Sequence, residues 1–156
     1  MRVGLKSLEQ PVDNGVTTLM RSWRKGRITI EKKIYRSDPY QIFFAQGTLV
    51  GNILYLSGQV GIDQDGNTPT HIADQAKIAY TNIQDVLVQF GVGMSNIVDE
   101  TFFVTDMNEF LGNVEDVYGV RKAAYGGNPQ VSQTVVQVVA LVHPVLKIEI
   151  KCIAHL

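Results

Sequence analysis

The last stretch of the chain, residues 133–154 (QTVVQVVALVHPVLKIEIKCIA), limits the possible folds more than any other. It reads as two strands joined at His143-Pro144, and its first half is a Val-rich run typical of a strand buried on both faces. In the second half, apolar and charged side chains alternate between two faces, with Ile148, Ile150 and Cys152 on one and Lys147, Glu149 and Lys151 on the other. A chain that ends in this way needs a sheet.

Glu149 is the residue on which the functional question depends. It has a lysine two residues away on each side of the same strand face. One reading is a solvated carboxylate in a surface ladder of charges. The other is a carboxylate at the rim of a cleft, where it handles a proton or a water molecule. The residues alone leave both readings open.

Length and composition predict one soluble globular domain. The chain has 156 residues, of which 45% are hydrophobic, and this is enough to bury a core without covalent cross-links. The single cysteine, Cys152, excludes an internal disulfide, and its apolar neighbours favour a packed thiol over a nucleophile. No apolar run reaches the roughly 18 residues of a membrane span, and the N-terminus lacks a secretory signal. We therefore expect a cytoplasmic protein without a membrane partner.

Charge is unevenly distributed along the chain. Residues 1–36 contain nine Lys/Arg and three Asp/Glu, whereas the rest contains five Lys/Arg and twelve Asp/Glu. We predict a basic N-terminal extension over 1–26, with a short helix over Val16 to Trp23, and a folded domain over 27–156. A basic segment lying on the acidic body of its own or a neighbouring subunit is favoured over a nucleic-acid arm, because only Trp23 offers a stacking ring.

Hydrophobic periodicity predicts a β-β-β-α-β-α-β-β order. The expected helices are 71–90 and 107–124, and the expected strands are 27–35, 43–49, 53–58, 97–105, 133–142 and 146–154. Two β-α-β units favour one mixed six-stranded sheet with both helices on a single face. The other face would be bare and apolar, which predicts a small homo-oligomer with functional clefts between subunits.

Familiar catalytic and metal-binding motifs are absent from the sequence. There is no HExxH, CxxC, GxSxG or Walker loop. The turn 63–67 is rich in carboxylates, but no Glu follows at the end of a twelve-residue calcium loop. The three histidines lie far apart in sequence. We therefore expect neither a metal nor a cofactor.

Four stretches together resemble the RidA/YjgF family of reactive intermediate deaminases, also described as endoribonuclease L-PSP-like. They are GNILYLSGQVGIDQDGN (51–67), DQAKIAYTNIQDVLVQFG (74–91), IVDETFFVTDMNEFLGNVEDVYG (97–119) and VLKIEIKCIA (145–154). The HPxLxIEIK run at 143–151 is most similar to the 2-aminomuconate deaminase branch. The resemblance covers about residues 28–155.

The resemblance implies a chorismate-mutase-like α+β fold and a barrel-like homotrimer with clefts at its subunit interfaces. It also implies hydrolysis of small enamine or imine intermediates to ketones and ammonia, without metal or cofactor. In such enzymes an arginine clamps the substrate carboxylate by a bidentate pair. A glutamate positions the attacking water, and backbone groups around the clamp strand hold the imine.

Carried over by position, the resemblance assigns the glutamate to Glu149 and the clamp arginine to Gln133. The clamp strand continues into Thr134 and Val135, whose backbone groups would bind substrate, and Gly58 keeps its place beside the cleft. Two further substrate-binding positions depart from the family pattern. Phe44 replaces a tyrosine and Glu115 replaces an asparagine.

Three hypotheses follow. In the first, the chain is a deaminase or tautomerase for a neutral, amide-bearing or cationic enamine or imine, with Glu149 as base and Gln133 as orienting group, because a neutral amide replaces the cationic anchor. In the second, it is a non-catalytic scaffold or small-metabolite-binding member of the fold. The third is RNA binding by the basic residues 21–36. The sequence does not favour it, because it offers no nuclease constellation.

Overall fold

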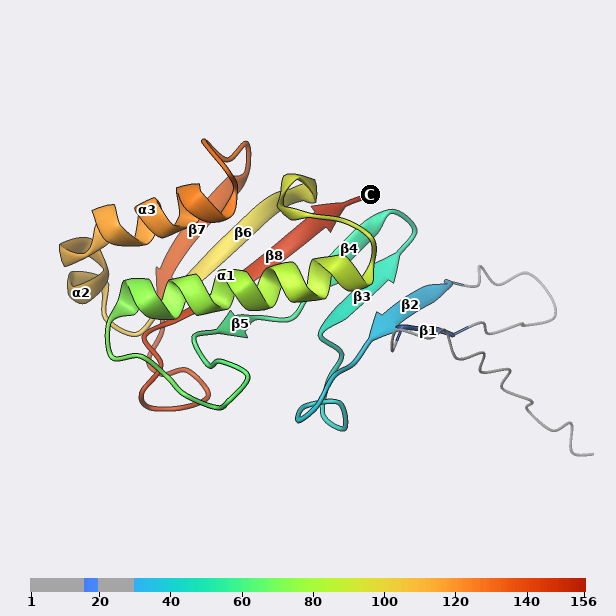
Figure 1. Ribbon diagram of the computed structural model, residues 1–156, viewed down its shortest axis with the longest axis horizontal. Coiled ribbons are helices and arrows are strands. Elements are labelled where there is room, and N and C mark those ends of the chain that lie inside the picture. Colours follow the sequence, from blue (N-terminus) through green and yellow to red (C-terminus); the bar gives the residue numbers. More distant parts are fainter. Residues whose placement is uncertain (1–15, 20–29) are drawn as a thin grey trace, which may run out of the picture.

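The computed structural model describes residues 16–19 and 30–156. Most of the predicted basic extension, including the Arg-rich stretch 21–27, lies outside the described residues. Along the chain (Figure 1) the elements are β1 (Val16–Leu19), β2 (Lys32–Tyr35), β3 (Gly47–Val50), β4 (Ile53–Leu56), β5 (Gln59–Val60), α1 (Ile72–Gln89), a short 3₁₀ turn (Met94–Asn96), β6 (Ile97–Val104), α2 (Met107–Gly112), α3 (Val114–Ala124), β7 (Ser132–Gln137) and β8 (Ile148–His155).

The described strands form one mixed sheet, as predicted. Its order is β1-β2-β3-β4-β8-β6-β7, and the short β5 also pairs with β8. Only β6 and β7 run parallel; every other pair is antiparallel. The sheet has eight strands rather than the expected six, because β5 forms beyond residue 58 and because β1 forms where a short helix was predicted. The sequence of β1, VTTL, is rich in β-branched residues and supplies a backbone edge for β2.

A β-bulge separates β4 from β5 on one side of β8. Tyr55 pairs with Ile153, and the next pair is Gln59 with Ile150. Three residues of the β4–β5 segment, 56–58, therefore lie opposite only two residues of β8, 151–152. An extra residue of this kind bends its strand and redirects the side chains around it. Here it places Gly58 beside Glu149.

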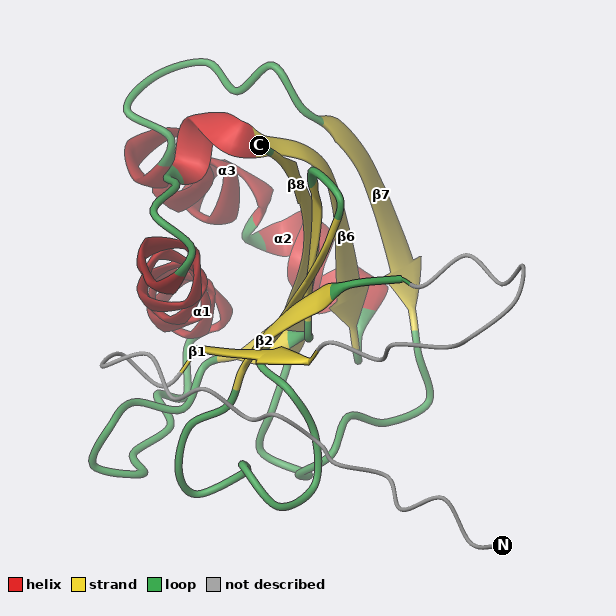
Figure 2. Cartoon of the chain, turned by 90° about the vertical axis from the view of Figure 1, so that its right-hand side faces the viewer, coloured by secondary structure: helices red, strands yellow, loops and turns green. Residues whose placement is uncertain are grey.

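The helices cover one face of the sheet, which confirms the predicted layering (Figure 2). The core lies between α1 and the sheet, where the apolar stripe of α1 packs on alternate residues of β4, β6 and β8. This stripe consists of Ile72, Ala76, Ala79, Ile83, Val86 and Leu87. The helix ends before Gly91, whose φ of 74° lies in the left-handed region that glycine tolerates.

The opposite face of the sheet carries the side chains of Thr48, Tyr55, Phe103, Glu149 and Lys151. Cross-strand pairing puts them on one face, because Thr48 pairs with Tyr55 and Phe103 pairs with Glu149. Tyr55 pairs with Ile153, which lies on the same face of β8 as Glu149 and Lys151. None of the described helices covers this face. The structure is that of a single chain, so the homotrimer stays a prediction. Among the described residues, no helix is long and apolar enough to cross a membrane.

Several element boundaries differ from the sequence prediction: β2 begins at Lys32, β4 ends at Leu56 and β8 begins at Ile148. Three other differences have a local cause. The second helix is split into α2 and α3 at Asn113, because Gly112 and Asn113 are poor helix formers. The strand predicted from residue 43 begins only at Gly47, since Phe43 and Phe44 belong to a turn in which both amides donate to the Tyr40 carbonyl. β7 ends at Gln137, and an exposed loop replaces the second half of the predicted strand.

Candidate active site on the uncovered sheet face

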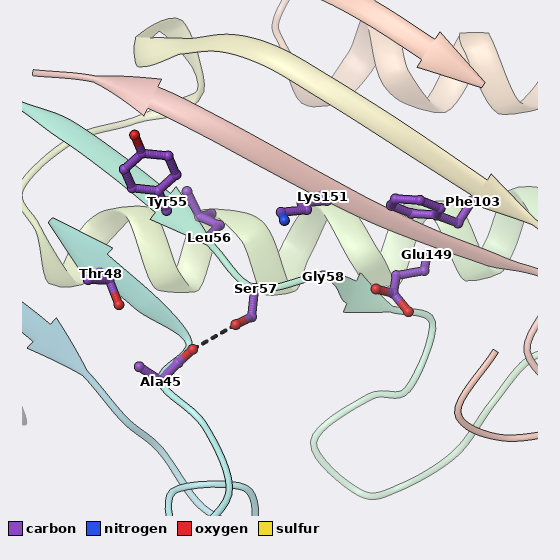
Figure 3. A pocket seen from close by; sticks show the side chains of 9 residues that line it. All are labelled: Ala45, Thr48, Tyr55, Leu56, Ser57, Gly58, Phe103, Glu149 and Lys151. Carbon is purple, nitrogen blue, oxygen red and sulfur yellow. Dashed lines mark hydrogen bonds between the residues drawn. The ribbon is translucent and has the colours of Figure 1, made fainter. Parts of the chain in front are cut away.

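Glu149 lines a pocket of about 440 Å³ on the uncovered face of the sheet (Figure 3). The walls come from β3, β4, the bulge, β6 and β8. They are formed by Ala45, Thr48, Tyr55, Leu56, Ser57, Gly58, Phe103, Glu149 and Lys151. Gly58 and Glu149 thus line the same pocket within one chain, and their roles in substrate binding and catalysis stay a prediction.

Gly58 leaves room for the Glu149 carboxylate. A Cβ atom built on Gly58 would overlap Oε1, and would also lie 2.6 Å from the carboxyl carbon of Glu149. A side chain at position 58 would therefore displace the Glu149 carboxylate, which is the flexible end of its own side chain and can move aside. The bulge thus brings the backbone of the β4–β5 segment directly against the acid.

Burial and a neighbouring lysine set the electrostatics of Glu149. The side chain is half-buried, and burial raises the pKa of its carboxyl above the ordinary value, while the positive charge of Lys151 partly opposes that rise. A carboxylate with a raised pKa is a better proton acceptor near neutral pH than a fully solvated one. The environment of Glu149 therefore favours the hypothesis of a carboxylate at the rim of a cleft over that of a solvated carboxylate in a surface ladder of charges.

The pocket also presents polar groups that sequence reasoning missed. Ser57 anchors one wall, because its hydroxyl donates to the Ala45 carbonyl at 2.7 Å and its amide donates to the Gln46 carbonyl at 2.9 Å. Thr48 and Tyr55 add hydroxyls, and Lys151 adds a cation. In the sequence, the alternation of residues 147–151 already put Lys151 on the same strand face as Glu149. This alternation could have identified Lys151 as a pocket residue.

Gln133 does not lie in this pocket. It pairs with Glu100 of β6, which in turn pairs with Cys152, so its side chain is on the helix-covered face of the sheet. There its Oε1 accepts a hydrogen bond of 2.6 Å from the Tyr118 hydroxyl. Its buried Nε2 has no partner among the described residues. Within one chain, the structure does not bring Gln133 to Glu149.

The other predicted substrate-binding residues also lie outside the pocket lining. Phe44 stacks on Tyr40 with ring centroids 5.6 Å apart. Glu115 is exposed in the first turn of α3. Thr134 faces the same side of the sheet as Glu149, in the row of Thr101 and Lys151, whereas Val135 packs against the core.

Comparison with known proteins identifies the family. The model of the family described as endoribonuclease L-PSP matches residues 37–156. The chain belongs to this family. The resemblance to RidA/YjgF proteins is thereby confirmed.

Relatives within the L-PSP family resemble this chain in sequence, and solved structures of the family resemble it in fold. The chain is 30% identical to the mouse 2-iminobutanoate/2-iminopropanoate deaminase, over 67% of this chain and 84% of that protein. It is 38% identical to the bovine protein of the same name, over 48% of this chain, but spans only 56% of the bovine length. Escherichia coli TdcF with bound serine superposes with a TM-score of 0.64 and 28% identity, covering 72% of this chain and 87% of TdcF. The Escherichia coli YjgF gene product gives the same values.

Two further groups in this L-PSP family chain bear on its chemistry. Cys152 is buried, and burial raises the pKa of its thiol, as expected for a core residue rather than a nucleophile. In the turn 63–67, the Asp63 carboxylate accepts from the amides of Asp65 and Asn67 and from the Asn67 side chain. Among the described residues, no three His, Cys, Asp or Glu side chains form a group suited to a metal ion.

A buried ion pair under β6 was not predicted from the sequence. Glu100 is fully buried, pairs with Arg121 of α3, and accepts from the hydroxyls of Tyr80 at 3.1 Å and Tyr125 at 3.0 Å. The Arg121 guanidinium also lies over the Tyr118 and Tyr125 rings. The pKa values of both Glu100-bound tyrosines are raised by burial and by the Glu100 charge. This cluster is part of the core and joins α1 and α3 to the sheet.

Proposed function

We propose that the chain hydrolyses or tautomerises reactive enamine or imine intermediates, with Glu149 as the group that moves protons. The observation that carries this proposal is a half-buried carboxylate with a raised pKa, held against Gly58 in a pocket lined by hydroxyls and a lysine. The names of the deaminase relatives support the reaction class.

In the proposed hydrolysis, Glu149 accepts a proton from water as the water oxygen bonds to the imine carbon. Glu149 returns this proton to the imine nitrogen, which gives the neutral carbinolamine. It then accepts the hydroxyl proton of the carbinolamine and delivers it to the nitrogen as the C–N bond breaks, so that the carbonyl product and ammonia leave. The carboxylate is unchanged at the end, and no redox partner is required. For an enamine, the same carboxyl group first delivers a proton to carbon.

The substrate class is narrowed by Lys151. Its positive charge in the pocket lining disfavours the cationic intermediates that replacement of the clamp arginine by Gln133 left open. A neutral, amide-bearing imine fits the proposed site. A carboxylate-bearing imine would pair its carboxylate with Lys151, because the clamp arginine is absent.

Gln133 enters this proposal through a neighbouring subunit. β7 is an edge strand of the sheet formed by the described residues, and we propose that another copy of the chain lies against it. The Gln133 Nε2 is a buried donor without a partner among the described residues. The proposed role requires this side chain to leave the Tyr118 hydroxyl and turn toward the subunit interface. In the proposed homotrimer, Gln133 of one subunit orients the substrate above Glu149 of the next.

The test is ammonia release from imines generated in situ from matched amino amides and amino acids. We expect acceleration over spontaneous hydrolysis, and loss of that acceleration in Glu149→Gln. Glu31→Gln, which removes an exposed carboxylate before β2, is the matched control and should behave as wild type. Equal rates with and without protein for both imine classes would refute the proposal. Ligand-induced stabilisation without turnover would instead favour the metabolite-binding alternative.

A further inference from the structure

A second cavity of about 400 Å³ lies behind the Glu149 pocket, on the helix side of the sheet. Its walls come from the 35–46 segment, the 59–66 segment and the middle of α1. They comprise Tyr35, Ser37, Asp38, Pro39, Tyr40, Gln46, Gln59, Ile62, Asp63, Gln64, Gly66, Asn82, Asp85 and Val86. The Glu149 chemistry described above uses none of these residues.

Two backbone segments form a common wall between the two cavities. Ala45 and Gly58 line the Glu149 pocket, whereas their chain neighbours Gln46 and Gln59 line the second cavity. The segments are fastened to each other, because the Ser57 amide donates to the Gln46 carbonyl and Gln59 Nε2 donates to Gln46 Oε1 at 3.1 Å. A ligand in the second cavity would therefore touch the reverse side of the wall that supports Glu149.

The charge of the second cavity is negative. It is lined by Asp38, Asp63 and Asp85, and none of its described lining residues is Lys, Arg or His. Hydrogen bonds from Asn67 lower the pKa of the Asp63 carboxyl, so that this group is anionic at neutral pH. Because its oxygens are used within its own turn, Asp63 contributes charge. Asp38 Oδ1 accepts from the Gln41 side-chain amide, which leaves Oδ2 for a ligand, and Asp85 is the second carboxylate in the lining.

Two buried amides provide an observation independent of the carboxylates. Gln46 and Gln59 are both 8% exposed. Gln59 Nε2 donates hydrogen bonds to Gln46 Oε1 and to the Ser57 carbonyl. Among the described residues, these bonds leave Gln46 Nε2 and Gln59 Oε1 without a partner, and neither is among the fully enclosed polar atoms. A buried amide pair thus keeps a donor and an acceptor available on the cavity side.

Aromatic rings complete the lining. Tyr35 and Tyr40 both border the cavity, and Tyr40 is supported from behind by its stacking on Phe44. Aromatic faces beside carboxylates are suited to an organic cation, because the ring quadrupole and the carboxylate charge both attract it.

We propose that this second cavity is a binding site for a small organic cation carrying a primary ammonium group. Asp38 and Asp85 pair with the ammonium, Gln59 Oε1 accepts one of its N–H groups, and Tyr40 covers the body of the molecule. This site is independent of the proposed reaction at Glu149.

The experiment is a binding titration of the full chain with three ligands of one shape and different charge: tyramine, the neutral tyrosol and the anionic 4-hydroxyphenylacetate. Backbone amide resonances of Gln59, Gly61 and Gly66 report on the site, and that of Gly58 reports on the common wall. We expect saturable shifts with tyramine, and binding at least about tenfold weaker for tyrosol and for the anion. The affinity for tyramine should fall as salt rises.

The variant Asp38→Asn/Asp85→Asn should weaken tyramine binding by about tenfold. Asp116→Asn, an exposed position on α3 outside the lining, is the matched control for loss of charge and should bind as wild type. Equal binding of the three ligands, an unchanged affinity in the double variant, or shifts confined to residues around Glu149 would each overturn the proposal. Because the readout is binding, none of these results depends on whether the chain has deaminase activity.

Discussion

The Glu149 carboxylate lies against the α-carbon of Gly58, in the space that a side chain at position 58 would occupy. Both residues belong to neighbouring segments of the sheet, and the bulge after β4 brings them together. Among the described residues, the backbone at Gly58, rather than a hydrogen-bonding side chain, borders the acid.

Replacing Gly58 by alanine should displace Glu149 and abolish most of the proposed activity. Because the Glu149 carboxylate can move aside, the stability cost should be smaller than the about 1–3 kcal/mol of an overpacked core. Gly93→Ala is the control, because a Cβ at Gly93 meets nothing within 4 Å. Activity assays and urea denaturation of both variants test this. Wild-type activity in Gly58→Ala would show that the close approach has no catalytic consequence.

The raised pKa of Glu149 should be visible in the pH dependence of the reaction. If the carboxylate is the base, kcat/KM rises with pH through a value above 4.5, the ordinary value of this group. An acid limb at or below 4.5 would contradict this assignment.

The Glu149 carboxyl should also make the stability of the protein fall as pH rises, whereas kcat/KM rises. Its folded-state pKa is raised, so the native state holds the proton more tightly than the unfolded chain, and stability falls as pH rises between the two values. Glu149→Gln should remove this fall and be more stable than wild type above that window. Thermal unfolding of both proteins at several pH values makes the comparison.

The buried pair Glu100–Arg121 should be far more important to stability than the half-exposed pair Glu109–Lys147. Glu100→Ala leaves a buried guanidinium without its partner and should cost about 3–5 kcal/mol in the free energy of unfolding. Lys147→Met, at the surface pair, should cost less than about 1 kcal/mol. Urea titrations measure both. Similar losses in the two variants would mean that Arg121 finds another partner when Glu100 is removed.

The uncovered sheet face predicts assembly. We expect a homotrimer in size-exclusion chromatography with light scattering, and dissociation in Val136→Arg, because Val136 lies on that face in the edge strand β7, in the row of Phe103 and Glu149. Val88→Arg, at an exposed position of α1, should leave assembly unchanged. A monomeric wild-type protein at micromolar concentration would remove the subunit cleft from the proposed function.

The proposed role of Gln133 can be separated from its structural role. Gln133→Ala should lower kcat/KM by about tenfold, the size of one lost hydrogen bond to substrate. Tyr118→Phe removes only the partner of Gln133 Oε1, and should change the melting temperature while leaving KM within about twofold of wild type. Equal effects of the two variants on both quantities would reduce Gln133 to a packing residue.

Periodicity in the sequence predicted the parts of the fold in which one face is strictly apolar. The stripe of α1 and the alternation of β8 both determine which residues face the core, and both agree with the structure. The split of the second helix was not predicted, although the poor helix formers Gly112 and Asn113 stand at that point in the sequence. The prediction of a longer β7 was wrong. It relied on the β propensity of Val139 and Val142, which are exposed, and β propensity alone does not supply a neighbouring strand to pair with.

The candidate site was predicted only in part, because strand register is not a local property. Alternation placed Lys151 with Glu149, and position within the resemblance placed Gly58. The orientation of Gln133 depends on its pairing with Glu100, and the burial of Glu100 depends on Arg121 from a distant helix. Neither relationship has a signal in a single sequence.

The bulge between β4 and β5 also makes the sheet resistant to slippage. Its two flanking segments pair with β8 in registers that differ by one residue. A shift of the whole segment along β8 would therefore turn the side chains of both halves to the wrong layer at once. The alignment of Gly58 with the acid is thus fixed by the ladder of the entire sheet, and it should survive any surface substitution that leaves strand pairing intact.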